Sequence, residues 1–269
     1  MSKKETNNMS FLAHLEELRW HLIRSTLAIF AVAIVVFIFR TQVYEQFLFA
    51  HLNGDFPTYQ WLCNLSKALS IESEMCNLEF GTDTLQSLNP SGQIMNAVWT
   101  SLILGFIVAF PYIIWEMWRF ISPGLHQNER KKSRLFIFSA SILFFLGVLF
   151  SYFIVAPLSV YFFYSFQITD IIKNQFSFQS HISLITSTLL GVSLMFELPV
   201  IIYFLSKMGL VTPEFLKKYR KIAIVLVLVL AAIITPPDIA SQVIVSIPIL
   251  ILYEISIHIS KFVIKNQEH

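Results

Sequence analysis

The stretch Phe120–Arg134, FISPGLHQNERKKSR, decides the fold, because it separates two long apolar segments with a short polar connection. Pro123 and Gly124 predict a turn in its middle, since proline fixes φ and glycine accepts positive φ. Four Lys and Arg side chains lie within it, against a single carboxylate, Glu129. Such a loop between membrane helices is either plain surface or one side of a binding site for a cationic ligand.

The composition indicates a membrane protein. Of the 269 residues, 55% are hydrophobic and only 13% are charged, whereas a soluble domain carries roughly 25% charged residues. The N-terminal run MSKKETNNMS is polar, and no small-residue cleavage site follows the first apolar segment, so we expect no cleavable signal peptide. The sequence therefore predicts one membrane domain over residues 1–269, embedded in a lipid bilayer.

Six apolar segments approach the roughly 20 residues that a membrane-spanning helix needs. An amphipathic segment at 10–19 precedes them, and an extended external loop at 41–93 follows the first. We place the six helices at about 20–39, 94–118, 135–166, 182–205, 222–234 and 239–259.

Prolines inside these segments predict kinked helices and a concave structure. The fifth segment has only about 13 residues and reaches about 20 Å, short of a hydrocarbon core of roughly 30 Å. The turn Thr235-Pro236-Pro237-Asp238 ends it. The expected fold is an all-α polytopic membrane protein with short fifth and sixth helices.

The distribution of Lys and Arg fixes the expected orientation. Sixteen of them lie on the side of the two termini and the Phe120–Arg134 loop, and three lie on the opposite side. Because cytoplasmic loops carry the excess of positive charge, we expect both termini and this loop to be cytoplasmic.

The external loop contains both cysteines, Cys63 and Cys76. In an oxidising compartment they could close a loop and restrict the unfolded chain. Spacing alone does not establish the geometry of a disulfide, so two free buried thiols remain the alternative.

Three carboxylates are candidates for function. Glu197 lies inside an apolar segment, where an ionisable group costs on the order of 3 kcal/mol and faces a cavity, a partner or a polar cluster. The alternative is a buried carboxyl satisfied by a hydroxyl or by backbone groups. Glu17 and Glu129 both belong to the cytoplasmic face and would suit a guanidinium ligand, although each could equally be a solvated helix-end acid.

Other chemistry is missing from the sequence. The seven histidines show no metal-ligand spacing, and there is no HExxH, GxSxG or P-loop motif. We expect no metal, no cofactor, no nucleic-acid partner and no enzymatic activity.

Four motifs in this order resemble the TatC family, the receptor subunit of the twin-arginine protein translocase. They are HLEELRWHL (14–22), FISPGLHQNER (120–130), FELPV (196–200) and TPPDIASQ (235–242), and the similarity spans roughly residues 10–262. The resemblance implies a protein of the bacterial cytoplasmic (inner) membrane that binds twin-arginine signal peptides of folded cargo at its cytoplasmic face. It also implies assembly with single-span TatA/TatB-type subunits, self-association in a complex and export driven by the proton-motive force.

The resemblance carries site residues over by position. Signal-peptide binding falls to Glu17, Arg19, Phe120, Pro123 and Glu129, and the intramembrane polar site to Glu197. Partner helices would dock at Thr235 and Gln242, and Asp238 is the acid of the external turn. His21 departs from the family, which often has Arg there.

The main alternative is a proton-coupled small-solute membrane transporter that uses Glu197. The lack of internal repeats and of a second intramembrane ion partner counts against it. An intramembrane hydrolase fails for want of a nucleophile–base pair.

Overall fold

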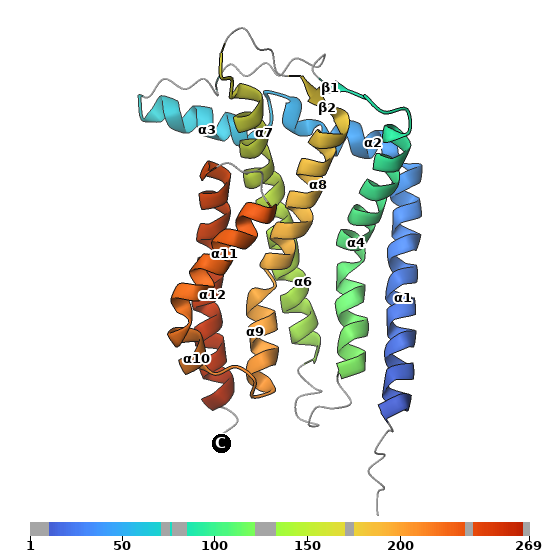
Figure 1. Cartoon of the computed structure of the whole chain (residues 1–269), viewed down its shortest axis with the longest axis vertical. Coiled ribbons are helices and arrows are strands. Elements are labelled where there is room, and N and C mark those ends of the chain that lie inside the picture. The colour runs from blue at the N-terminus through green and yellow to red at the C-terminus, as the bar shows by residue number, and fades with distance from the viewer. Residues whose placement is uncertain are drawn as a thin grey trace, which may run out of the picture. The chain divides into compact units, whose positions relative to one another are not determined.

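The computed structural model describes residues 11–70, 76, 85–121, 133–169, 175–234 and 239–265. Its helices (Figure 1) are α1 (Phe11–Ile38), α2 (Arg40–Val43), η1 (Tyr44–Leu48), η2 (Ala50–Leu52), α3 (Pro57–Ala68), α4 (Gly92–Ile121), α6 (Ser133–Phe150), η6 (Ser151–Val155), α7 (Ala156–Ser165), α8 (Phe178–Met195), α9 (Leu198–Lys207), α10 (Pro213–Lys218), α11 (Arg220–Ile234) and α12 (Ile239–Lys265). Two short strands, β1 (Leu85–Gln86) and β2 (Phe176–Ser177), pair in parallel.

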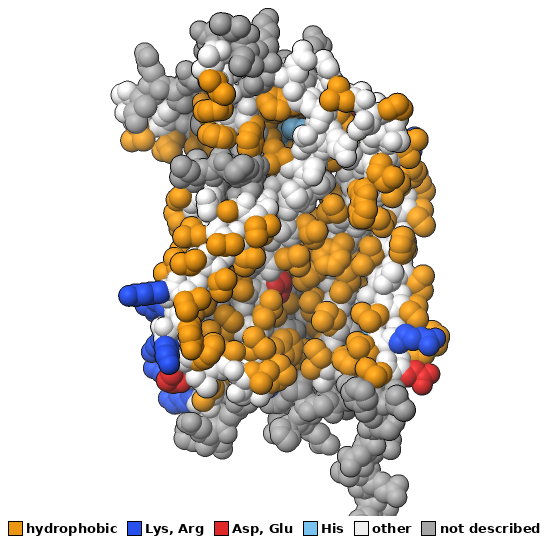
Figure 2. All heavy atoms as spheres, in the orientation of Figure 1, with side chains coloured by type: hydrophobic (Ala, Val, Ile, Leu, Met, Phe, Trp, Pro, Cys, Tyr) orange, Lys and Arg blue, Asp and Glu red, His pale blue; other side chains and the backbone are white. Residues whose placement is uncertain are grey.

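The chain divides into two compact units. The first contains Met1–Ile38 and Ser101–Ser141, and the second contains Phe39–Thr100 and Ile142–His269. Hydrophobic side chains cover much of the face that Figure 2 shows, as a lipid-facing exterior requires.

Five helical stretches in the described part of the chain are long and apolar enough to cross a membrane. They are Leu15–Ile38, Gly92–Ile121, Ile137–Ser165, Phe178–Lys207 and Gln242–Lys265. The prediction of an all-helical membrane protein is thereby confirmed. The segment expected at 222–234 is α11, whose 15 residues fall short of that length.

In the first unit, α1 and α4 approach closely at Gly105. A Cβ atom at this position would lie 2.9 Å from the carbonyl oxygen of Ile29 and 3.0 Å from the Ala33 Cβ. Small residues allow membrane helices to pack backbone against backbone in this way. The amphipathic segment expected at 10–19 merges into the first helix, since α1 runs without a break from Phe11 to Ile38.

In the second unit, the third apolar segment contains a π-helical turn. The helix widens at η6, directly before Pro157 in the first turn of α7. Proline cannot donate to the carbonyl of the residue four positions earlier, and a π-bulge is a common way to absorb this loss. The freed Phe153 carbonyl accepts a hydrogen bond from the Thr58 hydroxyl, and the Tyr152 carbonyl lies 3.0 Å from His51 Nε2.

The prediction of a short sixth helix is wrong. α12 has 27 residues and contains Pro248. The helix continues through Lys261 to Lys265, since long cationic side chains can extend from a membrane helix towards water. α12 packs against α9 and lies side by side with α11 (Figure 1).

The long loop expected at 41–93 contains short helices in its described part. α2, η1, η2 and α3 lie within it or at its start, and the structure joins Cys63 on α3 to Cys76 in a disulfide. Aromatic packing stabilises these short helices, because Phe56 stacks on Phe153 and the Phe47 ring stacks on Tyr152 at 4.3 Å between centroids.

Candidate functional site

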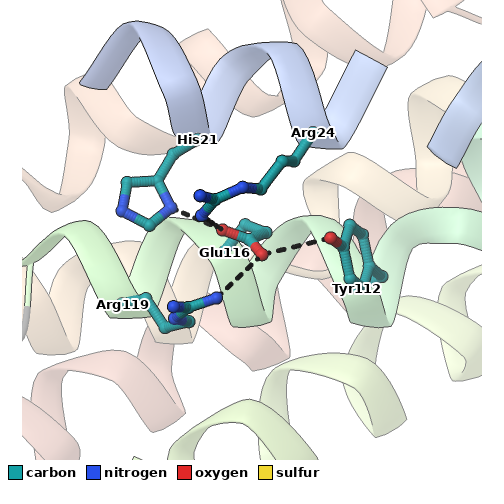
Figure 3. Close-up of polar contacts among 5 residues, drawn as sticks. All are labelled: His21, Arg24, Tyr112, Glu116 and Arg119. Atoms are coloured by element: carbon teal, nitrogen blue, oxygen red, sulfur yellow. Dashed lines mark hydrogen bonds and ion pairs between the residues drawn. The ribbon is translucent and has the colours of Figure 1, made fainter. Parts of the chain in front are cut away.

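A polar cluster centred on Glu116 joins α1 to α4 in the first unit (Figure 3). The Glu116 side chain is only 1% exposed. His21 Nδ1 donates to its Oε2 atom, while the Tyr112 hydroxyl and Arg119 Nη1 donate to Oε1 at 3.1 and 3.2 Å. Arg24 Nη1 lies 3.7 Å from Oε2. The carboxylate thus receives donors from both helices.

Helical spacing explains why these side chains meet. His21 and Arg24 are three positions apart on α1, and Tyr112, Glu116 and Arg119 occupy one face of α4 at spacings of four and three. Both arginine side chains remain about half exposed, at 46% and 47%. The protein's own cations therefore neutralise Glu116, which leaves this acid poorly suited to capture a cationic ligand.

Glu116 is not among the site residues predicted from the sequence. The signal was available, since Glu116 is an ionisable residue inside the apolar segment at 94–118, the same property that drew attention to Glu197. Its partners on α1 could not be identified, because His21 lies 95 residues away in the chain.

Glu17 lies one helical turn before His21 on α1 and is half-buried. Its Oε2 atom is buried and has no hydrogen-bond partner among the described residues. An acceptor in this state favours a donor from outside, because an unsatisfied buried polar atom is costly. Arg19 is exposed and lies over the Trp20 ring at 5.8 Å from its centroid.

Only part of the expected loop site can be placed. Phe120 follows Arg119 at the end of α4, and its ring lies edge-on to His21 with 6.2 Å between the centroids. The structure therefore brings Phe120 and the Glu116 cluster together. Pro123 and Glu129 lie outside the described residues.

Glu197 lies in the second unit, where it precedes the first residue of α9. It is 6% exposed, and neither carboxyl oxygen has a hydrogen bond of normal geometry in the described part of the chain. Its surroundings are closely packed, since a Cβ at Gly147 would lie 2.7 Å from Ser193 Cα and 3.0 Å from the Phe196 side chain. Glu197 is thus a buried residue between Phe196 and Leu198, which pack in an apolar cluster of this unit.

Gln242 already has a partner within the chain. Its Nε2 atom donates to the carbonyl oxygen of Leu228 on α11 at 3.0 Å, and the residue is half-buried. Docking of a partner helix at Gln242 stays a prediction. Thr235 and Asp238 lie outside the described residues.

The described residues contain no candidate metal site. Within 11–70, 76, 85–121, 133–169, 175–234 and 239–265, no group of three His, Cys, Asp or Glu side chains could hold a metal ion.

Comparison with known proteins identifies the family. The family described as "Sec-independent protein translocase protein (TatC)" matches residues 13–248. The chain belongs to the TatC family. The TatC of Blattabacterium sp. subsp. Periplaneta americana is 41% identical to this TatC chain, covering 98% of it and 100% of that protein. The TatC of Aquifex aeolicus is 32% identical, with coverages of 97% and 98%.

Solved TatC structures share the fold. Two crystal structures described as twin-arginine translocase receptor TatC superimpose with TM-scores of 0.72 and 0.68, at 34% and 32% identity. The first superposition covers 91% of this chain and 98% of the solved chain, and the second covers 93% and 99%.

Membership confirms the resemblance seen in the four motifs. This TatC chain is a multi-pass membrane protein of a bacterial family of Sec-independent protein translocases, a transport protein and not an enzyme. The alternative of a small-solute transporter is thereby set aside.

Proposed function

We propose that this TatC chain receives twin-arginine signal peptides of folded proteins at the end of α1 that carries Glu17. The observation that carries the proposal is the buried Oε2 atom of Glu17 on α1, which has no hydrogen-bond partner among the described residues. Glu116 on α4, by contrast, is neutralised by donors from α1 and α4. A guanidinium group would supply the missing donors, and a carboxylate can bind it in bidentate fashion.

Glu129 is proposed as the second acid for the arginine pair, with Pro123 shaping the loop that carries it. Phe120 supports this assignment, because it leads from α4 into that loop beside His21. The exposed side chain of Arg19 would bind acidic and polar residues of the signal peptide that lie beside its arginine pair.

Glu197 is proposed as the intramembrane polar site that acts after recognition. The burial of its carboxyl without a normal hydrogen bond supports a role with an incoming group. TatA/TatB-type single-span subunits would dock beside α11 and α12, where Thr235 and Gln242 lie, with Asp238 in the turn between the helices. Docking there would have to compete with the hydrogen bond from Gln242 to Leu228.

The proposed setting is the bacterial cytoplasmic membrane, with both termini cytoplasmic and α11 completing a sixth crossing. At 15 residues, α11 reaches about 22 Å, so the bilayer would thin around it or its ends would be hydrated. Copies of the chain would associate in the translocating complex, and the proton-motive force would drive export.

Peptide capture tests the site. We expect Glu17→Ala to weaken binding of a labelled twin-arginine signal peptide at least tenfold, which corresponds to about 1.4 kcal/mol. Glu129→Ala should act in the same direction. Glu16→Ala is the matched control, because Glu16 is the exposed neighbour on the same helix.

A peptide with lysines in place of the arginine pair separates charge from bidentate recognition. This lysine peptide should bind weakly to the unaltered chain, and Glu17→Ala should lower its affinity little further. Capture of the arginine peptide at full affinity by the double variant Glu17→Ala/Glu129→Ala would refute the site assignment. Glu197→Gln should keep capture intact and lower transport, so transport at the unaltered rate would remove Glu197 from the mechanism.

A further inference from the structure

α3 presents one face to the protein. At 100° per residue, Tyr59, Cys63 and Ser66 lie within one sector of this helix. Tyr59 is fully buried and Cys63 is 8% exposed. The Tyr59 hydroxyl lies 2.9 Å from the Pro157 carbonyl oxygen, which fixes α3 against α7.

The rest of α3 is divided into an apolar and a polar sector. Trp61 and Leu65, with Leu69 at the C-terminal cap, continue one stripe at a spacing of four and are 64%, 43% and 61% exposed. The exposed polar side chains of Gln60, Asn64 and Lys67 occupy a different sector. A helix with separate protein, apolar and polar sides is typical of a segment that lies in a membrane interface.

The docking point of α3 lies at the depth of such an interface. The apolar run of the third span begins at Leu135, directly after the cationic run that ends at Arg134. Counting from Leu135 at 1.5 Å per residue, Pro157 lies about 33 Å along the helix, close to the roughly 30 Å of a hydrocarbon core. α3 therefore contacts this span where the acyl chains give way to headgroups.

α3 also approaches the span from a side that is open. Phe153 and Ile154 in η6 are 39% and 38% exposed in a segment that crosses the membrane. Thr58, in the first turn of α3, donates to the Phe153 carbonyl, and the Phe56 ring stacks on Phe153 with 5.9 Å between centroids. The apolar stripe of α3 thus continues an exposed surface of the span.

We propose that α3 lies in the membrane interface at this end of the third span, with the stripe Trp61, Leu65 and Leu69 in contact with phospholipid. Trp is enriched at this level of membrane proteins, because its indole is apolar with one polar N–H group. Lys67 on the polar side directs its ammonium group to headgroup phosphates and water. α3 then anchors the connection between the first two spans to the bilayer surface.

Spin-label accessibility tests the proposal on the full chain in vesicles of phosphatidylethanolamine and phosphatidylglycerol. Cysteines 63 and 76 are joined, so a nitroxide reagent reacts with an introduced thiol alone. In Trp61→Cys and Leu65→Cys, we expect oxygen to reach the label several-fold better than a water-soluble nickel chelate. The matched controls Gln60→Cys and Asn64→Cys should show the reverse preference.

Three results would overturn the inference. Equal access of the nickel chelate at all four positions would place α3 in water. Exclusion of both reagents from the Trp61 and Leu65 labels, with spin–spin broadening, would mean that a second copy of the chain covers the stripe. If these variants misfold, the tryptophan fluorescence of the unaltered chain and of Trp61→Phe is compared in vesicles that contain brominated phospholipids. The bromine atoms should quench the unaltered chain more, and identical quenching would refute the contact of Trp61 with lipid.

Discussion

Glu116 should hold α1 against α4, and its removal should loosen that pair. The structure gives the carboxylate one hydrogen bond from α1 through His21 and two from α4, through Tyr112 and Arg119. At about 0.6 kcal/mol for each hydrogen bond in a membrane protein, the loss of all three removes about 2 kcal/mol, of which only the His21 contact acts between α1 and α4. Breaking a buried ion pair costs about 3–5 kcal/mol, but Arg24 and Arg119 are half exposed and can turn to water.

We therefore expect Glu116→Ala to lower the free energy of unfolding by about 2–3 kcal/mol, measured by reversible unfolding in mixed detergent micelles. Glu116→Gln keeps an acceptor for Tyr112 and should cost about half as much. Glu16→Ala, on the exposed side of α1, should stay within about 0.5 kcal/mol of the unaltered protein.

A double-mutant cycle identifies the partner. His21→Ala and Glu116→Ala each break the same contact, so their combined loss should fall short of the sum by at least about 0.5 kcal/mol. Additive losses would refute the reasoning, because the buried contact between His21 and Glu116 would then contribute nothing to the pairing of α1 with α4. A loss confined to Arg24→Ala would point to the surface charges instead.

Two further predictions concern the connection between the first two spans. Reduction of the Cys63–Cys76 disulfide should lower the midpoint of thermal unfolding, since closing a loop of this length contributes about 3 kcal/mol. In the control variant Cys63→Ser/Cys76→Ser, a reductant should leave the midpoint unchanged. An unchanged midpoint in the unaltered chain would contradict the expectation. Burial holds the pKa of His51 below its ordinary value, so the unfolded chain binds a proton on this imidazole at a higher pH than the folded chain does. The free energy of unfolding should therefore fall as the pH drops below about 6.5. His51→Gln should flatten this dependence on pH.

Much of the fold follows from hydropathy, because spanning helices must satisfy their backbone within themselves. Five of the six expected segments appear as long apolar helices, each within a few residues of its expected position. The sixth segment is predicted to end at about 259, whereas α12 continues past Lys261 to Lys265. A single cation near the end of a membrane helix does not stop it, since the backbone hydrogen bonds continue and the ammonium group extends to water.

The candidate site was predicted only where a residue stands out in its own segment. Glu197 stands out in this way as an ionisable residue in an apolar segment, whereas Glu17 is singled out only together with Glu129 on the cytoplasmic face, and the roles of all three stay predictions. The contact between His21 and Glu116 depends on how two helices distant in sequence pair. Hydropathy specifies that both helices exist, but the register at which Gly105 meets Ala33 sets which polar residues face each other.

The π-helical turn at η6 has a consequence for the order in which the protein can be made. His51 and Thr58 leave the ribosome about a hundred residues before the Tyr152 and Phe153 carbonyls that they contact. At translation rates of about 5–20 residues per second, the connection between the first two spans waits roughly 5–20 s for its acceptors. During that interval both cysteines are already made, so the disulfide can form before the third span is synthesised. An α3 already joined to Cys76 by the disulfide would then contact the newly inserted helix.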